Sequence, residues 1–260
     1  PHRVTGMGLF RCPAVPLWVM HLLEGGQIVD ADGTLEADVA IENGQIAAVG
    51  DIPESDVDAR TDVAGKFVVP GLIDTHVHLM MDGRPNAETV QGDNEAAYAY
   101  RTADNLRKAL EAGVTTIRDL GAPASVAIDA REAVADGTIA GPRVQACGQN
   151  ITMTGGHGHW FGREADGPDE VRKAVREQLK KGSDAVKCMA TGGVLTTGAK
   201  TGAPELGPDE LEALVDAAHA KGVPTAAHCH GTQGIKNAVL AGIDSVEHGT
   251  FMDEEAAELM

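Results

Sequence analysis

From Pro70 onward, short apolar runs alternate with amphipathic segments, and this alternation limits the fold more than any other feature. Six apolar runs have the length and composition of buried strands, at 72–76, 115–118, 143–147, 185–188, 224–228 and 245–248. Helix-like stretches follow them, at about 94–112, 125–136, 168–181, 208–221, 232–241 and from 252 onward. Strands that alternate with helices form parallel sheets, so the pattern leaves an open doubly wound sheet or a (β/α)₈ barrel.

Polar side chains favour the barrel, because they lie at the carboxyl ends of several different strands, where barrel enzymes place their active sites. We therefore predict an α/β fold in which residues 70–260 form an incomplete (β/α)₈, TIM-type barrel with about six β/α units. Residues 22–69 contain short strand patterns separated by turns, with a hairpin at Asn43-Gly44, and predict a small β-sandwich part. Residues 1–21 predict an atypical N-terminal extension, with a signal peptide as the alternative.

The charge of the chain narrows the classes of partner. Its formal net charge of −18 repels nucleic acid and anionic membranes, and favours a small-molecule substrate. No apolar run approaches the roughly 20 residues that a membrane span needs. Four cysteines without C-x-x-C spacing predict buried, reduced thiols in a cytoplasmic protein.

Two histidines close the first barrel strand, in the run GLIDTHVH at residues 71–78. Side chains two residues apart on a strand project from the same face, so His76 and His78 lie side by side. In a closed barrel that face is the interior, where two neutral imidazoles can hold a transition metal. The alternative is a pair of polar core or loop histidines, since H-x-H is a common tripeptide.

Lys187 lies within a short buried-strand pattern, at residues 184–189. Burial lowers the pKa of a lysine, and the neutral amine can react with CO₂ to give a carbamate that bridges two metal ions. The alternative is an ion pair with a nearby acid such as Asp184. His228 and His248 each end a strand, and His230 follows two residues after His228. So many ligand-type side chains at strand ends favour a metal site over a structural role.

Arg118 and Asp119 lie at the end of the second barrel strand. We expect them to form a structural ion pair that supports the rim of the barrel.

These motifs, taken in order, resemble the amidohydrolase superfamily: GLIDTHVH, the strand lysine, the HCH of the fifth strand and the EHG of the sixth. The resemblance covers nearly the whole chain from about residue 22. The segments GVTTIRDLG (113–121), ITMTGGHGH (151–159) and AAHCHG (226–231) are most similar to the imidazolonepropionase-like and prolidase-like group, which includes Xaa-Pro dipeptidases.

The resemblance implies a site with two divalent metal ions, by default zinc. His76 and His78 would bind the more buried ion, and carboxylated Lys187 would bridge both ions. His228 and His248 would bind the second ion. A hydroxide shared by the two metals would then be the nucleophile.

The same resemblance implies that His157 reaches the substrate carbonyl or the tetrahedral oxyanion, and that His230 meets the free carboxylate of the substrate. The predicted enzyme is a binuclear metal-dependent amidohydrolase or dipeptidase that cleaves a C–N amide bond in a dipeptide or an N-acyl amino acid. The alternatives are a cyclic-amide hydrolase, of the imidazolonepropionase or dihydroorotase kind, and a non-catalytic truncated scaffold. Lys187 argues against imidazolonepropionases, which lack the bridging lysine. A homo-oligomer is compatible with the family.

The chain departs from the family at its carboxyl end. Family members carry an aspartate at the end of strand eight as metal ligand and general base, and this sequence reaches Met260 before strands seven and eight. Six strands would leave two outer edges unpaired. We therefore expect a fragment of a longer protein, with weak activity or none by itself.

Overall fold

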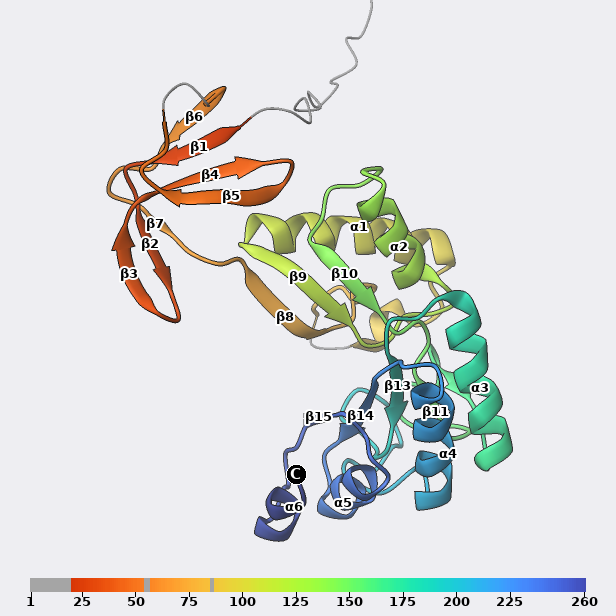
Figure 1. The fold of residues 1–260 in the computed structure, drawn as a ribbon. Helices are drawn as coiled ribbons and strands as arrows, with labels where there is room; N and C mark the ends of the chain where they lie inside the picture. The colour runs from red at the N-terminus through yellow and green to blue at the C-terminus, as the bar shows by residue number, and fades with distance from the viewer. Residues whose placement is uncertain (1–19, 54–56, 85–86) are drawn as a thin grey trace, which may run out of the picture. The chain divides into compact units, whose positions relative to one another are not determined.

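A computed structural model describes residues 20–53, 57–84 and 87–260, and divides the chain into two compact units, Pro1–Pro70 and Gly71–Met260 (Figure 1). Residues 1–19 of the predicted N-terminal extension lie outside the described residues. Each unit is built from its own sheets.

The first unit contains two small sheets. One has the order β5-β4-β1-β6 and the other β3-β2-β7. Their strands are β1 (His21–Glu24), β2 (Gln27–Asp30), β3 (Gly33–Glu36), β4 (Asp38–Glu42), β5 (Gln45–Gly50), β6 (Ala59–Asp62) and β7 (Phe67–Val68). The predicted hairpin joins β4 to β5, and positive φ angles of 52° at Asn43 and 72° at Gly44 are those of a type I′ turn.

The second unit contains two parallel sheets, with the orders β10-β9-β8 and β12-β11-β13-β14-β15. Their strands are β8 (Leu72–Val77), β9 (Val114–Asp119), β10 (Arg143–Ala146), β11 (Ile151–Thr152), β12 (Arg163–Glu164), β13 (Val186–Met189), β14 (Thr225–Cys229) and β15 (Ser245–His248). All six predicted barrel strands are present. The two-residue strands β11 and β12 were not predicted, because they are too short to show a periodicity.

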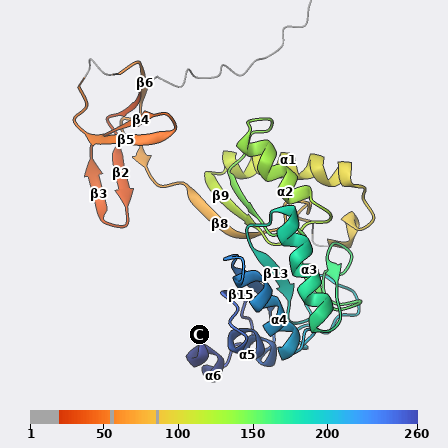
Figure 2. The same ribbon diagram turned by 45° about the vertical axis from the view of Figure 1, so that its right-hand side comes forward.

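Helices follow the strands in the predicted order. They are α1 (Glu95–Glu111), α2 (Val126–Ala135), α3 (Pro168–Lys181), α4 (Pro208–His219), α5 (Thr232–Leu240) and α6 (Glu254–Leu259), with a short 3₁₀ helix η2 (Ala87–Val90) before α1. Helix α3 begins with Pro168 in its first turn, and ends at Gly182, which has a left-handed φ of 89°. Figure 2 shows α3 and α4 side by side along the strands of the larger sheet.

The main core lies between β13 and β14 and the helices α3 to α5. Val186 and Cys188 of β13 and Ala227 of β14 are fully buried there, together with helix residues such as Leu214. Because side chains alternate along a strand, the residues between them face the opposite side of the sheet. Lys187 and His228 therefore project into the interior of the incomplete barrel.

Strands β8 and β10 are the outer strands of the three-stranded sheet, and β12 and β15 are those of the five-stranded sheet. Among the described residues, each of the four has a hydrogen-bonded partner on one side alone. On β8, Leu72 is 60% exposed and Ile73 is 67% exposed. The architecture is thus an incomplete (β/α) barrel of six units, as predicted, whose first and last strands, β8 and β15, are both outer strands.

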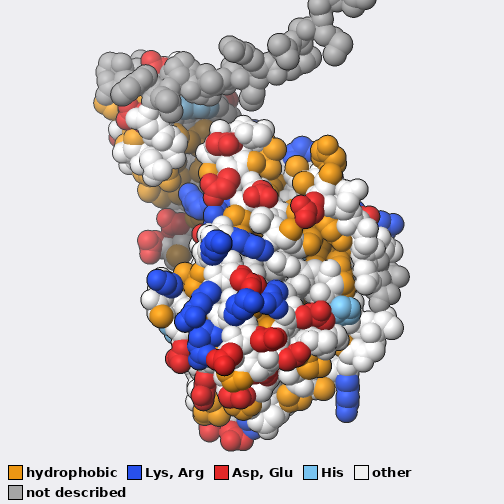
Figure 3. Space-filling model, turned by 90° about the vertical axis from the view of Figure 1, so that its right-hand side faces the viewer, with side chains coloured by type: hydrophobic (Ala, Val, Ile, Leu, Met, Phe, Trp, Pro, Cys, Tyr) orange, Lys and Arg blue, Asp and Glu red, His pale blue; other side chains and the backbone are white. Residues whose placement is uncertain are grey.

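The outer surface mixes charges of both signs (Figure 3). Helix α3 contributes basic side chains along its length, and α4 begins with acidic ones. Within the described part of the chain, no helix combines the length and the apolar character needed to cross a membrane.

Candidate metal centre

The register of the large sheet places the candidate residues at two levels of the barrel interior. Lys187 of β13 pairs with Ala226 of β14. One level higher, Met189 pairs with His228, and His228 pairs in turn with Glu247 of β15. Adjacent paired residues in a parallel sheet face the same side, so Lys187, His228 and Glu247 all point into the interior.

The two histidines of β8 each have one ring nitrogen engaged. His78 Nδ1 lies 2.8 Å from the carbonyl oxygen of Gly121, and His76 Nδ1 lies 2.7 Å from Glu247 Oε2. A carbonyl and a carboxylate can only accept, so both Nδ1 atoms carry the hydrogen. In the neutral rings, the lone pair on Nε2 is then free to bind a metal.

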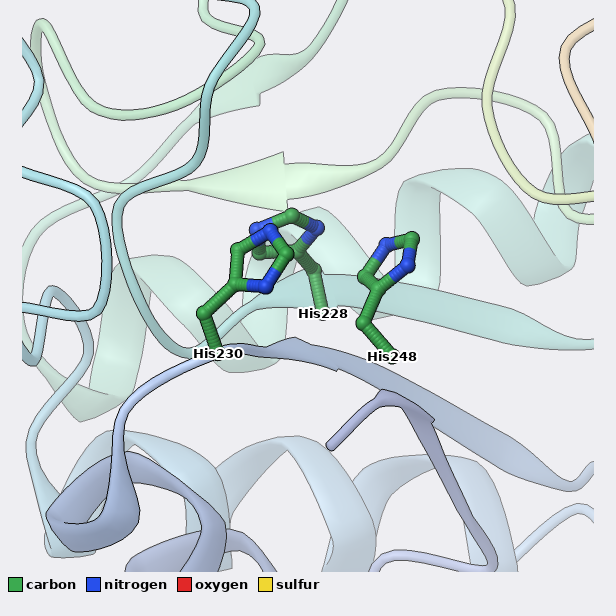
Figure 4. A group of neighbouring side chains, drawn as sticks. All are labelled: His228, His230 and His248. Atoms are coloured by element: carbon green, nitrogen blue, oxygen red, sulfur yellow. The ribbon is translucent and has the colours of Figure 1, made fainter. Parts of the chain in front are cut away.

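His228, His230 and His248 point toward one another at the ends of β14 and β15 (Figure 4). Each offers one ring nitrogen, and these atoms all lie within 4.8 Å of one another. The ring of His248 also lies 4.8 Å from that of His76, measured between centroids. The cluster therefore links the carboxyl ends of β8, β14 and β15.

The backbone of His248 departs from strand geometry. Its φ angle is +73°, in the left-handed region that residues other than glycine seldom occupy. Strict alternation from Glu247 would direct the imidazole of His248 away from the interior. The left-handed turn instead brings it back beside His228 and His230, which is the kind of local strain found at functional sites.

Lys187 is 1% exposed, and among the described residues its Nζ has no hydrogen-bond partner. Burial lowers its pKa, so the neutral amine is favoured. The expected alternative, an ion pair with Asp184, does not form, because Asp184 pairs with Arg131 at 2.6 Å.

Burial also lowers the pKa of several of these histidines, including His78, His157 and His228. Desolvation is the largest cause that lowers the pKa of His78 to about 3 and that of His157 to about 4. Desolvation likewise lowers the pKa of His228, whose Nε2 is buried and has no partner among the described residues. Neutral imidazoles are the protonation state that binds metals.

His157 lies on the loop after β11, and a second loop, after β13, holds it in place. Its Nδ1 is 3.0 Å from Thr196 Oγ1, and its backbone N–H donates to the Glu205 carboxylate at 2.8 and 3.0 Å. A methyl group on Gly193 would lie 2.4 Å from His157 Nε2, so glycine is required there. The His157 ring stands 4.4 Å from that of His228.

The predicted ion pair between Arg118 and Asp119 is wrong. Neighbouring residues on β9 face opposite sides, and the two side chains find different partners. Arg118 Nη2 donates to Glu247 Oε1 at 2.8 Å, whereas Asp119 accepts from the backbone N–H groups of Leu79 and Gly121.

Sequence reasoning missed three polar residues that hold the candidate site together: Glu247, Glu205 and Thr196. Glu247 had a usable signal, since it is an acid inside a short apolar strand and next to a candidate ligand. The other two lie in a loop rich in glycine and threonine, whose side-chain partners cannot be read from periodicity.

The sequence and the fold of this chain are similar to those of known hydrolases. The family model described as "Amidohydrolase family" matches residues 67–259. Ochratoxinase from Aspergillus niger is 31% identical over 272 residues, which cover 92% of this chain and 56% of the relative. The crystal structure of a Xaa-Pro dipeptidase with bound methionine in the active site has a TM-score of 0.86 and 33% identity, and covers 93% of this chain and 64% of that one.

A prolidase complexed with N-methylphosphonate-L-proline is similar to the same degree, with a TM-score of 0.86, 32% identity and the same coverage of 93% and 64%. The chain thus spans less than two thirds of the length of these relatives. The family match covers well over half of the chain and includes every histidine and the lysine of the candidate centre. The chain belongs to the amidohydrolase family.

Proposed function

We propose that this protein is a metal-dependent hydrolase that cleaves a C–N amide bond. The observation that carries the proposal is the convergence of imidazoles around a buried lysine that has no hydrogen-bond partner among the described residues, at the carboxyl ends of parallel strands. Barrel enzymes place their chemistry at this end. Membership of the amidohydrolase family supports the same reaction class.

The donor set fits two divalent ions. His76 and His78 would hold one ion through Nε2, and His228 and His248 would hold the other. Lys187 would bridge the two ions after carboxylation. Imidazole and carboxylate-type donors suit zinc best among the common ions. When bound, such ions supply Lewis-acid activation of a water molecule and of the substrate carbonyl.

Carboxylation of Lys187 needs a neutral amine and room for CO₂. The amine attacks CO₂, a C–N bond forms, and one proton leaves to give an anionic carbamate. Burial without a partner makes the charged ammonium unfavourable, so this residue is suited to the reaction. Binding to cations would then offset the cost of burying the carbamate.

His157 and His230 would bind the substrate. Thr196 Oγ1 accepts from the N–H of Gly158, and so its own hydrogen is available to His157 Nδ1. His157 Nε2 then carries a hydrogen that it can donate to the substrate carbonyl oxygen as negative charge develops there. His230 Nδ1 lies 2.7 Å from Thr250 Oγ1, which leaves Nε2 to meet the free carboxylate of the substrate.

The proposed substrate is a dipeptide, cleaved as a prolidase cleaves its substrates, or an N-acyl amino acid. The Xaa-Pro dipeptidase and prolidase relatives support this class. A free carboxylate beside the scissile amide is what His230 would recognise.

A substrate panel tests the proposal. The protein is supplied with zinc and bicarbonate and offered Xaa-Pro and other dipeptides, N-acyl amino acids, hydantoin, dihydroorotate and imidazolone propionate. We expect release of a free amino acid, abolished by a chelator and by His228→Asn. Turnover of a cyclic amide alone would overturn the substrate class, and a protein that neither binds metal nor turns over any compound would be a non-catalytic scaffold.

A further inference from the structure

Glu247 is a buried acid to which the proposed chemistry gives no role. It is 7% exposed and lies on the interior face of β15. Both of its carboxylate oxygens are engaged: Oε2 by His76 Nδ1 at 2.7 Å, and Oε1 by Arg118 Nη2 at 2.8 Å and Ser245 Oγ at 2.6 Å. A buried carboxylate with this many donors is fixed in position.

Arg118 is itself held from a second direction. Its Nε donates to the carbonyl oxygen of Thr75 at 2.7 Å, on the strand that carries His76. The guanidinium thus ties β9 to β8 while it orients Glu247 on β15. As a result, the position of the Glu247 carboxylate relative to His76 depends on three strands from two sheets.

We propose that Glu247, held by Arg118 and Ser245, is a positioning residue that fixes the tautomer and ring orientation of His76 for metal binding. The inference rests on the proposed function, in which His76 is a metal ligand. A carboxylate can only accept, so His76 must carry its hydrogen on Nδ1 and present the lone pair of Nε2. The Gly121 carbonyl oxygen does the same for His78, so both histidines of the motif are held in one tautomer.

A purely structural role is the alternative, because the same contacts join the outer strands β8 and β15. Two properties separate these roles. The tautomer of His76 in the metal-free protein reports on positioning directly, and zinc affinity reports on its consequence. Loss of an outer carboxylate partner typically lowers metal affinity by about 10- to 100-fold.

The first experiment needs no substitution. Long-range ¹H–¹⁵N correlation spectra of the metal-free wild-type protein, at a pH where the ring is neutral, assign the hydrogen of His76. We expect it on Nδ1. A hydrogen on Nε2 would overturn the inference, whatever the stability of any variant.

The second experiment compares Glu247→Gln with Glu177→Gln, a matched control on helix α3 in which Arg163 loses its carboxylate partner at 2.8 Å. The side-chain amide of glutamine has one accepting oxygen. It therefore cannot accept from His76 through one atom and from Arg118 and Ser245 through the other. We expect Glu247→Gln to bind zinc at least about tenfold more weakly in chelator competition, and Glu177→Gln to bind it like the wild type.

Equal zinc affinity of wild type and Glu247→Gln would overturn the inference and leave the proposed function standing. Failure of the wild type to bind zinc would instead count against the proposed function, while the spectra would still decide the tautomer. Should Glu247→Gln not fold, Ser245→Ala removes one donor and keeps the His76 contact. We expect Ser245→Ala to weaken zinc binding about threefold, because Glu247 is held less firmly, and an unchanged affinity would count against positioning through Ser245.

Discussion

The Nδ1 atom of His157 and the hydroxyl oxygen of Thr196 lie 3.0 Å apart, and this contact joins the histidine loop after β11 to the loop after β13. The same hydroxyl accepts from the N–H of Gly158. One threonine therefore holds both the backbone at Gly158 and the imidazole of His157, on the loop that would approach the substrate.

Thr196→Val tests that contact, because valine keeps the shape and removes the hydroxyl. It leaves the buried Gly158 N–H without its acceptor, at a cost of about 1–3 kcal/mol in the free energy of unfolding. We expect kcat to fall at least about tenfold with unchanged zinc content, since His157 would no longer donate reliably to the substrate oxygen. The matched control is Thr201→Val on the same loop, where the hydroxyl donates to the Gly193 carbonyl oxygen over a longer distance of 3.4 Å. Equal kcat for both variants would contradict this role.

Lys187→Met tests the bridging lysine. Methionine fills a similar volume and removes a buried amine that has no hydrogen-bond partner in the described part of the chain. The metal-free variant should therefore be at least as stable as the wild type, by up to about 1–4 kcal/mol. Its zinc content should fall, because no carbamate can form. Lys221→Met, at an exposed position after α4, should change neither property. Thermal melts and elemental analysis measure both effects, and a full zinc complement in Lys187→Met would refute the bridging role.

The left-handed backbone of His248 predicts a difference between two substitutions that both remove the imidazole. His248→Asn should fold with nearly wild-type stability, because asparagine tolerates a φ of +73°. His248→Val should lose about 1–3 kcal/mol, since a β-branched residue is strained there. Both should bind less zinc. Chemical denaturation compares the two, and equal stability would show that the strained backbone relaxes freely.

Stability of the metal-free protein should fall in acid. In the folded state the pKa of His78 is about 3 and that of His157 about 4, whereas an unfolded histidine titrates near about 6.5. Between about pH 6.5 and 4, the unfolded chain binds protons that the folded chain excludes, so the free energy of unfolding decreases as pH falls. Each such group contributes up to about 1.4 kcal/mol per pH unit.

Below that range Glu247 adds to the same trend. Burial would raise its pKa, but hydrogen bonds from His76 and Ser245 and the Arg118 charge lower it to about 2. Urea unfolding at pH 7, 6 and 5 measures the slope. His157→Asn should reduce by about one the number of protons taken up on unfolding, and so make this slope shallower. An unfolding free energy that is constant or rises toward pH 5 would contradict the burial of neutral histidines.

The sequence was enough to predict features that depend on local periodicity. The six barrel strands and their helices follow from alternating and helical patterns, and the Asn43-Gly44 hairpin follows from residues that accept positive φ. His76, His78, His228 and His248 were found because they lie at or near strand ends, and the carboxyl ends of parallel strands meet. Lys187 was found because a lysine stands inside a buried-strand pattern.

Contacts across the barrel interior were beyond such reasoning. Arg118 was paired with its sequence neighbour Asp119, yet its partner Glu247 is 129 residues away on another sheet. Which interior side chains meet depends on how two sheets pack, and a pattern along one strand does not contain that information. The turned backbone at His248 is likewise set by the packing around it.

The zinc content of the protein purified with zinc and bicarbonate, measured by elemental analysis, decides whether the candidate centre binds two metal ions. We expect about two zinc ions per chain, and fewer in Lys187→Met and in His228→Asn. A content below one ion per chain, in protein that melts cooperatively, would contradict it and leave the amidohydrolase fold as a scaffold without its metals.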